Sequence, residues 1–366
     1  MKFDELQISN FRGIDNAKLK KLEQVNLIVG KNNSGKTSLL EAMFLLSGMS
    51  NPELLLSINT FRSLKLANDN DFKYIFYNLN MDKSIKLSGK ISGIERRATI
   101  SPYADTTRDI FIKNIEDQKL FDPSLIGYIS FNELGQVDKS SLKNEIKEIE
   151  GIKITFKNNN DPEQEVYISI KNGRIRLSNT YKENLSTRYL NSQITLADKG
   201  TDLSSIVKKK RINSLVDILK TIEPNLIDIQ IANDNSIYFD IGEDELLPIN
   251  VMGDGIRRTL AVLGSMYDMR DGVLLIDEIE NGLHYSSIKI FWRAILELAK
   301  QFDVQIIATT HSYEAVKALK DAQLENKTNK NEIALYRIEK KDNKTKIIHY
   351  DYEDIIISLD SDYEVR

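Results

Sequence analysis

The sequence of 366 residues has no cysteine and only three histidines. Without cysteine it can form no disulfide, no thiolate zinc site and no cysteine nucleophile, and three histidines offer little for an imidazole-rich metal site. Long apolar runs are missing too, because none approaches the roughly 18 residues of a membrane span. The first residues, MKFDELQ, also lack the apolar segment of a signal peptide. We therefore expect a cytoplasmic protein that does not enter a membrane.

Positive charge is also in short supply. Lysine and arginine number 50 against 54 aspartates and glutamates, so the net charge is −4. The chain as a whole is no polycation, and nucleic acid, if it binds, has to meet a local basic patch. The run Lys208–Arg211 is one candidate, with a solvated helix face as the plainer alternative. Hydrophobic residues make up 41%, enough for the core of one large domain or two.

The stretch GKNNSGKT, residues 30–37, follows the apolar run VNLIV and precedes the helix-like SLLEAMFLLSG. Its spacing fits the phosphate-binding pattern G-x-x-x-x-G-K-[ST]. Glycines let the backbone curl so that N–H groups point at an anion, and the helix N-terminus adds partial positive charge. Lys36 would reach the β- and γ-phosphates, and the Thr37 hydroxyl would bind Mg²⁺. The predicted nucleotide ligands here are Gly30, Asn32, Asn33, Ser34, Gly35, Lys36, Thr37 and Ser38.

Two later apolar strands end in polar residues that suit the same site. The first is followed by Asp277 and Glu278. Asp277 would hold Mg²⁺ through water, and Glu278 would orient the water that attacks the γ-phosphorus. The second, VQIIATT, is followed by His311, which could donate a hydrogen bond to the γ-phosphate and sense its loss. The predicted catalytic residues are therefore Lys36, Glu278 and His311.

A second glycine-rich helix start occurs in NVMGDGIRRTLAVLGSM, where Gly253 and Gly255 flank Asp254. Such a start is a second anion site. One nucleotide does not need two anion sites of this kind, and the glycine-rich start at Gly253 is not followed by a lysine as the phosphate loop is. We therefore expect Gly253, Asp254 and Gly255 to cap the γ-phosphate bound by another copy of the protein. This predicts a homodimer that encloses ATP, or a higher homo-oligomer.

The motifs GKNNSGKT, MGDGIRR, LLIDEIENGLH and ATTHS resemble, in this order, the Walker A, signature, Walker B with D-loop, and H-loop motifs of ABC-type ATPase heads. They look most like the OLD-family and related AAA-type ATPases of bacterial anti-phage systems. The resemblance implies an α/β P-loop NTPase fold, an ABC-ATPase-like head with a mixed β-sheet, a strand-rich insertion and a helical lobe. Lobe I would comprise about 1–185 and 268–366, and lobe II about 186–267. ATP and Mg²⁺ would be the cofactors.

The resemblance also suggests roles for residues outside the four motifs. Arg12 matches an N-terminal segment that lies near the nucleotide, and Glu280–His284 match the D-loop that crosses to the partner. Gln193 is the candidate Q-loop ligand of the metal. The Toprim nuclease domain of full-length OLD proteins is not evident, and we interpret the D-x-D pair of Asp360 and Asp362 as part of an acidic tail.

The pattern of apolar residues predicts the elements that carry these motifs. FDELQISNFRGI and KLEQVNLIVG indicate two strands, and short strands are expected within 74–103, including YIFYNLN. Asn172-Gly173 predicts a hairpin turn, and IDIQIANDNSIYFDI a second hairpin. A helix is expected over 202–223. The last hundred residues alternate strands and helices, which predicts a mostly parallel sheet with ligands at its carboxyl edge.

Three functional classes compete for such an ATPase. The favoured one is a sensor or regulator of an anti-phage defence system that controls a separately encoded effector, such as a Toprim- or HNH-type nuclease encoded nearby. The alternative is a RecF- or SMC-like ATPase that acts directly on DNA in repair. A transporter subunit fits least, because the signature MGDGI differs from the LSGGQ of transporters and the strand-rich insertion is unlike that class.

Overall fold

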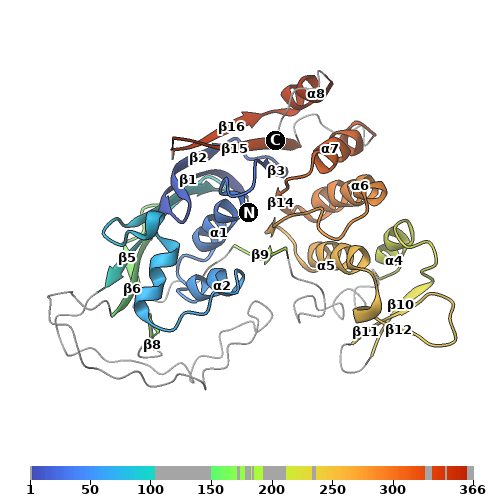
Figure 1. Ribbon diagram of the computed structural model, residues 1–366, viewed down its shortest axis with the longest axis horizontal. Coiled ribbons are helices and arrows are strands. Elements are labelled where there is room, and N and C mark those ends of the chain that lie inside the picture. Colours follow the sequence, from blue (N-terminus) through green and yellow to red (C-terminus); the bar gives the residue numbers. More distant parts are fainter. Residues whose placement is uncertain are drawn as a thin grey trace.

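A computed structural model describes residues 2–103, 150–170, 174–177, 183, 185–192, 212–232, 236–325, 332–342 and 344–360. Within these ranges the chain forms two large β-sheets with one helix between them, a six-stranded core sheet and a seven-stranded second sheet, and further helices cover the far face of the core sheet (Figure 1). No helix in this part of the chain is both long and apolar enough to cross a membrane.

The core sheet has six strands in the order β16-β15-β3-β14-β13-β9. All neighbours are parallel except the antiparallel pair β15 and β16. This confirms the mostly parallel sheet expected from the alternation of strands and helices. The strands are β3 (Val25–Val29), β9 (Thr187–Leu190), β13 (Val273–Ile276), β14 (Gln305–Thr309), β15 (Ile333–Lys341) and β16 (Lys344–Tyr350).

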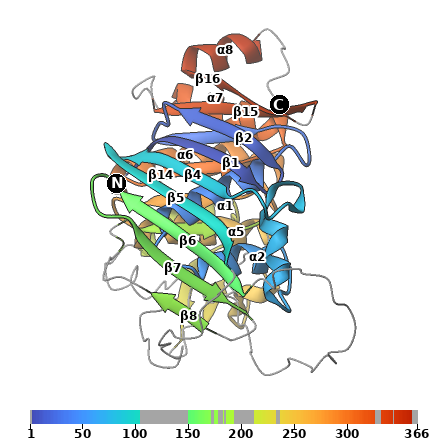
Figure 2. The same cartoon turned by 90° about the vertical axis from the view of Figure 1, so that its left-hand side faces the viewer.

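The second sheet is antiparallel throughout, with seven strands in the order β2-β1-β4-β5-β6-β7-β8 (Figure 2). Its last pair, β7 and β8, flanks the predicted Asn172-Gly173 turn and is antiparallel as expected. The turn itself lies outside the described residues. The strands are β1 (Phe3–Phe11), β2 (Ile14–Lys20), β4 (Ile85–Ile91), β5 (Ile94–Tyr103), β6 (Gly151–Asn158), β7 (Gln164–Ser169) and β8 (Arg174–Leu177).

Helix α1 (Lys36–Ser47) lies between the two sheets, and every residue in it except Thr37 is buried. The central strands of the core sheet, β3, β14 and β13, are buried on both faces, with α1 on one face and other helices on the opposite face, as is usual for parallel strands covered by helices. Alternate residues of β13 show this, because Val273 and Leu275 pack with α1 whereas Leu274 and Ile276 pack with α5 and α6. The site at the end of β3 is therefore held by packing from both directions.

The remaining helices surround this framework. Helix α2 (Leu54–Thr60) follows α1, while α5 (Asp254–Asp268), α6 (Tyr285–Phe302) and α7 (Tyr313–Glu325) cover the far face of the core sheet (Figure 1). The Ser312 hydroxyl accepts a hydrogen bond from the Ala315 N–H at 3.1 Å, which caps α7 at its start as Ser/Thr caps do.

The proposed second lobe is not purely helical. It contains α4 (Ile212–Lys220) and α5, but also a small antiparallel sheet of β10 (Asp228–Ile231), β11 (Ile237–Asp240) and β12 (Leu247–Pro248), followed by the 3-10 turn η5 (Ile249–Val251). The β10–β11 hairpin confirms the predicted one. Of the predicted helix over 202–223, residues 202–211 lie outside the described residues, and so does the basic run at 208–211.

The structure differs from the sequence-based expectations in three places. The strand predicted over 74–80 is absent, because these residues run through the ends of two 3-10 helices, η1 (Asp69–Ile75) and η2 (Tyr77–Leu79), and Asn78 and Leu79 have positive φ angles of 53° and 57°. The strands predicted for FDELQISNFRGI and KLEQVNLIVG are present as β1 and β3, but β2 between them was not predicted. The acidic tail was expected to include Asp360, but that residue ends α8 (Tyr352–Asp360), which buries Tyr352, Ile355 and Leu359 against the core.

The buried Gln305 side chain joins the two large sheets. Its carbonyl oxygen accepts from the Phe3 N–H at 2.8 Å, and its amide donates to the carbonyls of Phe3 and Glu23, both at 2.9 Å. Gln305 is fully buried at the first position of β14, and Phe3 opens β1. One amide therefore satisfies three backbone groups that water cannot reach easily.

We predict that Gln305→Leu lowers the free energy of unfolding by about 2–4 kcal/mol, because backbone groups of Phe3 and Glu23 lose their partners while the volume is nearly kept. Urea denaturation measures the change. The matched control is Gln7→Leu on the exposed face of β1, which should change stability by less than about 0.5 kcal/mol. Equal effects of the two substitutions would contradict the role given to Gln305.

Candidate functional site

The phosphate-binding loop connects β3 to α1 and needs glycine for steric reasons. Gly30 has a φ of 151°, and a Cβ there would lie 2.4 Å from the carbonyl oxygen of Ile338 in β15. Gly35, with a φ of 110°, stands at the N-cap of α1. It provides no side-chain cap, and the first turn has no acidic residue. The N–H groups of that turn are thus oriented for an anion.

Two polar side chains inside the loop fit a polyphosphate. Lys36 is 8% exposed, and its ammonium donates to the carbonyls of Gly30 at 2.7 Å and Lys31 at 3.1 Å. Burial lowers the pKa of Lys36, while the nearby carboxylates of Asp277 and Glu278 act to raise it. The buried Ser34 hydroxyl has no hydrogen-bond partner within the described ranges. An unpaired buried hydroxyl beside a buried cation is what a bound phosphate would satisfy.

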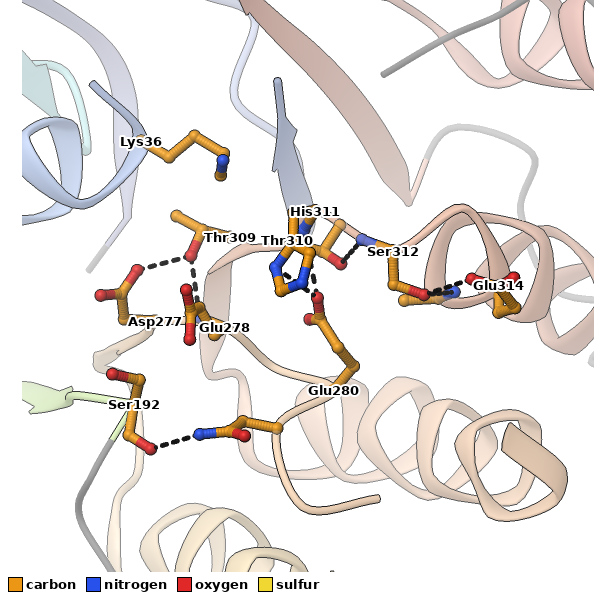
Figure 3. Close-up of polar contacts among 12 residues, drawn as sticks. Lys36, Ser192, Asp277, Glu278, Glu280, Thr309, Thr310, His311, Ser312 and Glu314 are labelled. Carbon is orange, nitrogen blue, oxygen red and sulfur yellow. Dashed lines mark hydrogen bonds and ion pairs between the residues drawn. The ribbon is translucent and has the colours of Figure 1, made fainter. Parts of the chain in front are cut away.

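Asp277, directly after β13, accepts hydrogen bonds from two hydroxyls. The Thr37 hydroxyl lies 3.1 and 3.0 Å from its two carboxylate oxygens. The Thr309 hydroxyl donates to this carboxylate at 2.6 Å (Figure 3). A hydroxyl beside a carboxylate is an oxygen set that suits Mg²⁺, which takes its remaining ligands from water and phosphate. In the part of the chain that the structure describes, no cluster of three His, Asp or Glu could hold a metal alone.

Glu278 follows in an unusual backbone conformation. Its φ is 49°, in the left-handed region that few non-glycine residues adopt. Its N–H donates to the Thr309 hydroxyl at 2.9 Å, so that hydroxyl is shared by both acidic residues. Figure 3 shows Asp277 and Glu278 on the same side of Thr309. Sequence reasoning assigned no role to Thr309, although its place at the end of the strand next to β13 is a usable signal.

His311 is held by a carboxylate from the neighbouring loop. The Glu280 carboxylate accepts the backbone N–H of His311 at 3.1 Å and lies 3.2 Å from the ring Nδ1 (Figure 3). Glu280 is mostly buried, whereas His311 is about half exposed. The pair fixes the ring through Nδ1 and leaves Nε2 available to a ligand. The sequence placed Glu280 only in the D-loop, so this contact with His311 was missed.

The glycine-rich start of α5 touches the D-loop of the same chain. A Cβ on Gly255 would lie 2.7 Å from the Gly282 carbonyl oxygen, and one on Gly282 would lie 2.9 Å from the Asp254 Cβ. Asp254 itself pairs with Arg257 one turn later. At Gly253, by contrast, a Cβ would meet no atom within 4 Å. The phosphate loop is therefore not among the neighbours of this open end.

Arg12, another predicted ligand, has partners in α1 and α2. Arg12 forms an ion pair with the fully buried Glu41 at 2.6 Å, and Glu41 also pairs with Arg62 at 2.7 Å. The Arg12 guanidinium further donates to the Ile58 carbonyl at 3.0 Å. The Arg12 side chain thus contacts α1 and α2. Its part in nucleotide binding stays a prediction. Gln193 lies outside the described residues.

Strand β9 nevertheless ends where a Q-loop residue would be useful, because the Asp277 N–H donates to the Leu190 carbonyl at 2.8 Å. The sheet edge therefore gathers the ends of β3, β9, β13 and β14. A phosphate loop before a buried helix, with a carboxylate pair after β13, the next strand but one in the sheet, defines a P-loop ATPase head.

Comparison with known proteins agrees with this class. The chain belongs to the family described as an AAA ATPase domain, whose model matches residues 1–316. It is 24% identical over 336 residues to an "ATP/GTP phosphatase" of Helicobacter pylori, covering 86% of each chain. It is also 40% identical to the DNA replication and repair protein RecF of Shewanella sediminis, but over only 89 residues, 24% of this chain and 23% of RecF.

A solved structure of an SMC head bound to the C-terminal winged-helix domain of ScpA shares the fold. The TM-score is 0.50 at 13% identity, and the match covers 98% of this chain and all of that one. The fold is therefore the expected ABC-type ATPase head, with a mixed core sheet and a strand-rich second sheet.

We predict that Arg12→Met lowers the free energy of unfolding by about 3–5 kcal/mol, because it leaves the buried Glu41 with one cation fewer. ATP affinity of the folded protein should stay within about threefold, since the guanidinium faces Glu41. The control Lys18→Met removes an exposed partner 4.0 Å from Glu5 and should cost under about 1 kcal/mol. If Arg12→Met is stable but no longer binds ATP, Arg12 contributes to the nucleotide site and this prediction is wrong.

Proposed function

We propose that this chain binds and hydrolyses ATP with Mg²⁺ at a site shared by two copies, and that the cycle controls a separately encoded effector in an anti-phage defence system. One observation carries the shared site. The glycine-rich start of α5 is open at Gly253, and its contacts at Gly255 are with its own D-loop and not with its own phosphate loop. A second anion site with no anion-binding partner among the described residues suits the nucleotide of another copy.

The residues on the first copy have separable tasks. Lys36 and the loop N–H groups would neutralise and orient the β- and γ-phosphates, while Thr37 and Asp277 would hold Mg²⁺, which supplies charge stabilisation when bound. Glu278 would position and polarise the attacking water. His311, fixed by Glu280 through Nδ1, would present Nε2 to the γ-phosphate. The name of the Helicobacter pylori relative, "ATP/GTP phosphatase", supports hydrolysis as the reaction.

The second copy would complete the site from its α5. The positive end of that helix and the backbone around Gly253 and Gly255 would meet the γ-phosphate. Exposed apolar side chains flank this end, because Val251 is 64% and Tyr285 is 72% exposed. Burying them against a second copy would add affinity to the closed state. ATP would then favour the closed dimer, and its hydrolysis would remove that preference.

The proposed regulatory role rests on analogy, and the described residues show no second chemical centre beside the ATP site. Outside the ATP site, the described residues include no metal-binding cluster of histidine and carboxylate side chains. Of the D-x-D pair, Asp360 ends α8 and Asp362 lies beyond the described residues. Cleavage of nucleic acid would then come from a partner such as a Toprim- or HNH-type nuclease encoded nearby. The warrant is analogy with OLD-family ATPases, which the motifs resemble.

The similarity to RecF favours a second candidate function. It covers about a quarter of the chain and raises the alternative of an ATPase that acts directly on DNA. The two functions differ in what stimulates hydrolysis, since DNA alone would suffice for a RecF-like protein, whereas the regulator would need its effector or a trigger.

Lys36→Ala should weaken ATP binding more than tenfold, because it removes the cation on the β- and γ-phosphates. Glu278→Gln should bind ATP normally but hydrolyse it about 10²–10⁴-fold more slowly, since only the attacking water loses its partner. Binding of a fluorescent ATP analogue and steady-state phosphate release separate the two effects. Wild-type turnover by Glu278→Gln would show that another residue activates the water.

Mixing two inactive variants tests the shared site. Gly253→Arg should fold normally, because a Cβ there would meet no described atom within 4 Å, but it should block the nucleotide of the partner. Gly255 is a poorer choice, since a Cβ there would clash with Gly282. An equal mixture of Gly253→Arg and Lys36→Ala should regain about a quarter of wild-type activity, as half the dimers then hold one intact site of two. A mixture as inactive as its components would contradict the shared site.

The effector assignment is tested with the purified chain alone. With ATP and Mg²⁺ or Mn²⁺ it should hydrolyse ATP but leave plasmid, single-stranded DNA and transfer RNA uncut. Adding the product of a neighbouring nuclease gene should produce ATP-dependent cleavage that Glu278→Gln alters. DNA that accelerates ATP hydrolysis more than about tenfold without any partner would favour the RecF-like function. Cleavage by the chain alone that is lost in Asp360→Ala would reveal a metal site at the C-terminus.

A further inference from the structure

Arg258 links α5 to the turn that carries the catalytic carboxylate. It lies in the second turn of α5 and is 3% exposed. One terminal nitrogen donates to the Asn191 carbonyl at 2.6 Å, just after β9. The other donates to the Asp277 carbonyl at 2.6 Å and approaches the Glu278 carbonyl at 3.5 Å. A single guanidinium thus joins three segments that are far apart in the sequence.

The partners of Arg258 in these bonds are backbone carbonyls. Burial lowers the pKa of Arg258 to about 10, so the group is still a cation near neutral pH. A buried cation is expensive unless its hydrogen bonds are made, and the planar fork of arginine can serve carbonyls on two sides at once. Lysine has the charge but not this fork. The position therefore requires the geometry of arginine as well as its charge.

These bonds fix the backbone on both sides of Glu278. The carbonyls of Asp277 and Glu278 face Arg258, while the Glu278 N–H is held by the Thr309 hydroxyl. Between these contacts Glu278 has a φ of 49°. Strained backbone persists only where its surroundings hold it from several sides. Without Arg258, the Asp277 carbonyl loses this donor, and the Glu278 carbonyl keeps the Asn281 N–H at 3.0 Å. One of the constraints that set the direction of the Glu278 side chain is then lost.

Arg258 also stands one turn after the end of α5 that the proposed partner nucleotide would meet. The same end touches the D-loop through Gly255 and Gly282. A shift of α5 would therefore move the turn at Glu278 through two connections. We infer that Arg258 is a positioning residue: it orients the Glu278 carboxylate, and the position of α5 determines that orientation. This inference rests on the proposed ATP hydrolysis, since it assigns a residue to the same reaction.

The first test is kinetic. Arg258→Lys should keep ATP affinity within about threefold of wild type but lower kcat more than tenfold, because one ammonium cannot serve both groups of carbonyls. Combined with Glu278→Gln it should cause little further loss, since a residue that acts through Glu278 has no effect once Glu278 is inactive. The control Arg293→Lys, at an exposed ion pair on α6, should leave kcat unchanged. Losses that multiply in the double variant, or a fall that lies wholly in KM, would overturn the inference.

The second test does not depend on hydrolysis. Hydrogen exchange in the nucleotide-free protein should become at least tenfold faster in peptides covering 277–283 of Arg258→Lys, and stay unchanged over 305–309. Unchanged exchange at 277–283 would overturn the positioning role whatever the kinetics show. A wild-type protein that does not hydrolyse ATP would instead refute the proposed function, and the exchange result would still decide whether Arg258 holds the turn.

Discussion

The hydrogen bonds to the Asp277 carboxylate are the interaction on which the rest of the site depends. Its two oxygens accept from Thr37 at the start of α1 and from Thr309 at the end of β14. These residues are 240 and 32 positions away in the sequence. Parallel pairing of β3, β14 and β13 brings their carboxyl ends to one edge, and the carboxylate then fixes the loops relative to one another. The sheet brings the ends of these strands together, and the hydrogen bonds of Asp277 fix the distances to Thr37 and Thr309.

The position of α1 is a second constraint with a different origin. The helix is enclosed by both sheets, so its direction is decided by packing along its whole length. The buried Glu41 adds a charge that two arginines must balance, and Arg62 also donates to the Ser38 hydroxyl at 3.3 Å. A cluster of this kind fixes register more than it adds stability. It holds the N-terminus of α1, and therefore the phosphate loop, at the sheet edge.

Close backbone contact ties the remaining elements together. Gly255 and Gly282 approach so closely that neither position has room for a side chain, and Arg258 reaches from the same helix to the carbonyls after β13. The start of α5, the D-loop and the turn at Asp277 and Glu278 therefore form one connected unit. If the open end at Gly253 meets a nucleotide on another copy, this unit is the physical route by which one site affects the other.

The sequence by itself determined the elements whose signals are local. Glycines at 30 and 35, the lysine after them and the apolar runs on either side predict strand, loop and helix, and the structure has all three there. Asp277, Glu278 and His311 were found because polar residues directly follow buried strands. Residues 74–80 were misjudged as a strand, since the left-handed Asn78 and Leu79 leave no mark in an apolar pattern.

Only the tertiary structure decided which distant groups meet. Thr309 serves Asp277, Glu280 holds His311 and Arg258 reaches the turn at Glu278, and no spacing in the sequence fixes any of these pairs. Arg12 is the opposite case. Its place in a motif suggested a contact with the nucleotide, whereas in the structure its guanidinium pairs with the buried Glu41 of α1. Conformational preference and periodicity are properties of neighbouring residues, whereas pairing of buried polar groups depends on how whole sheets and helices pack.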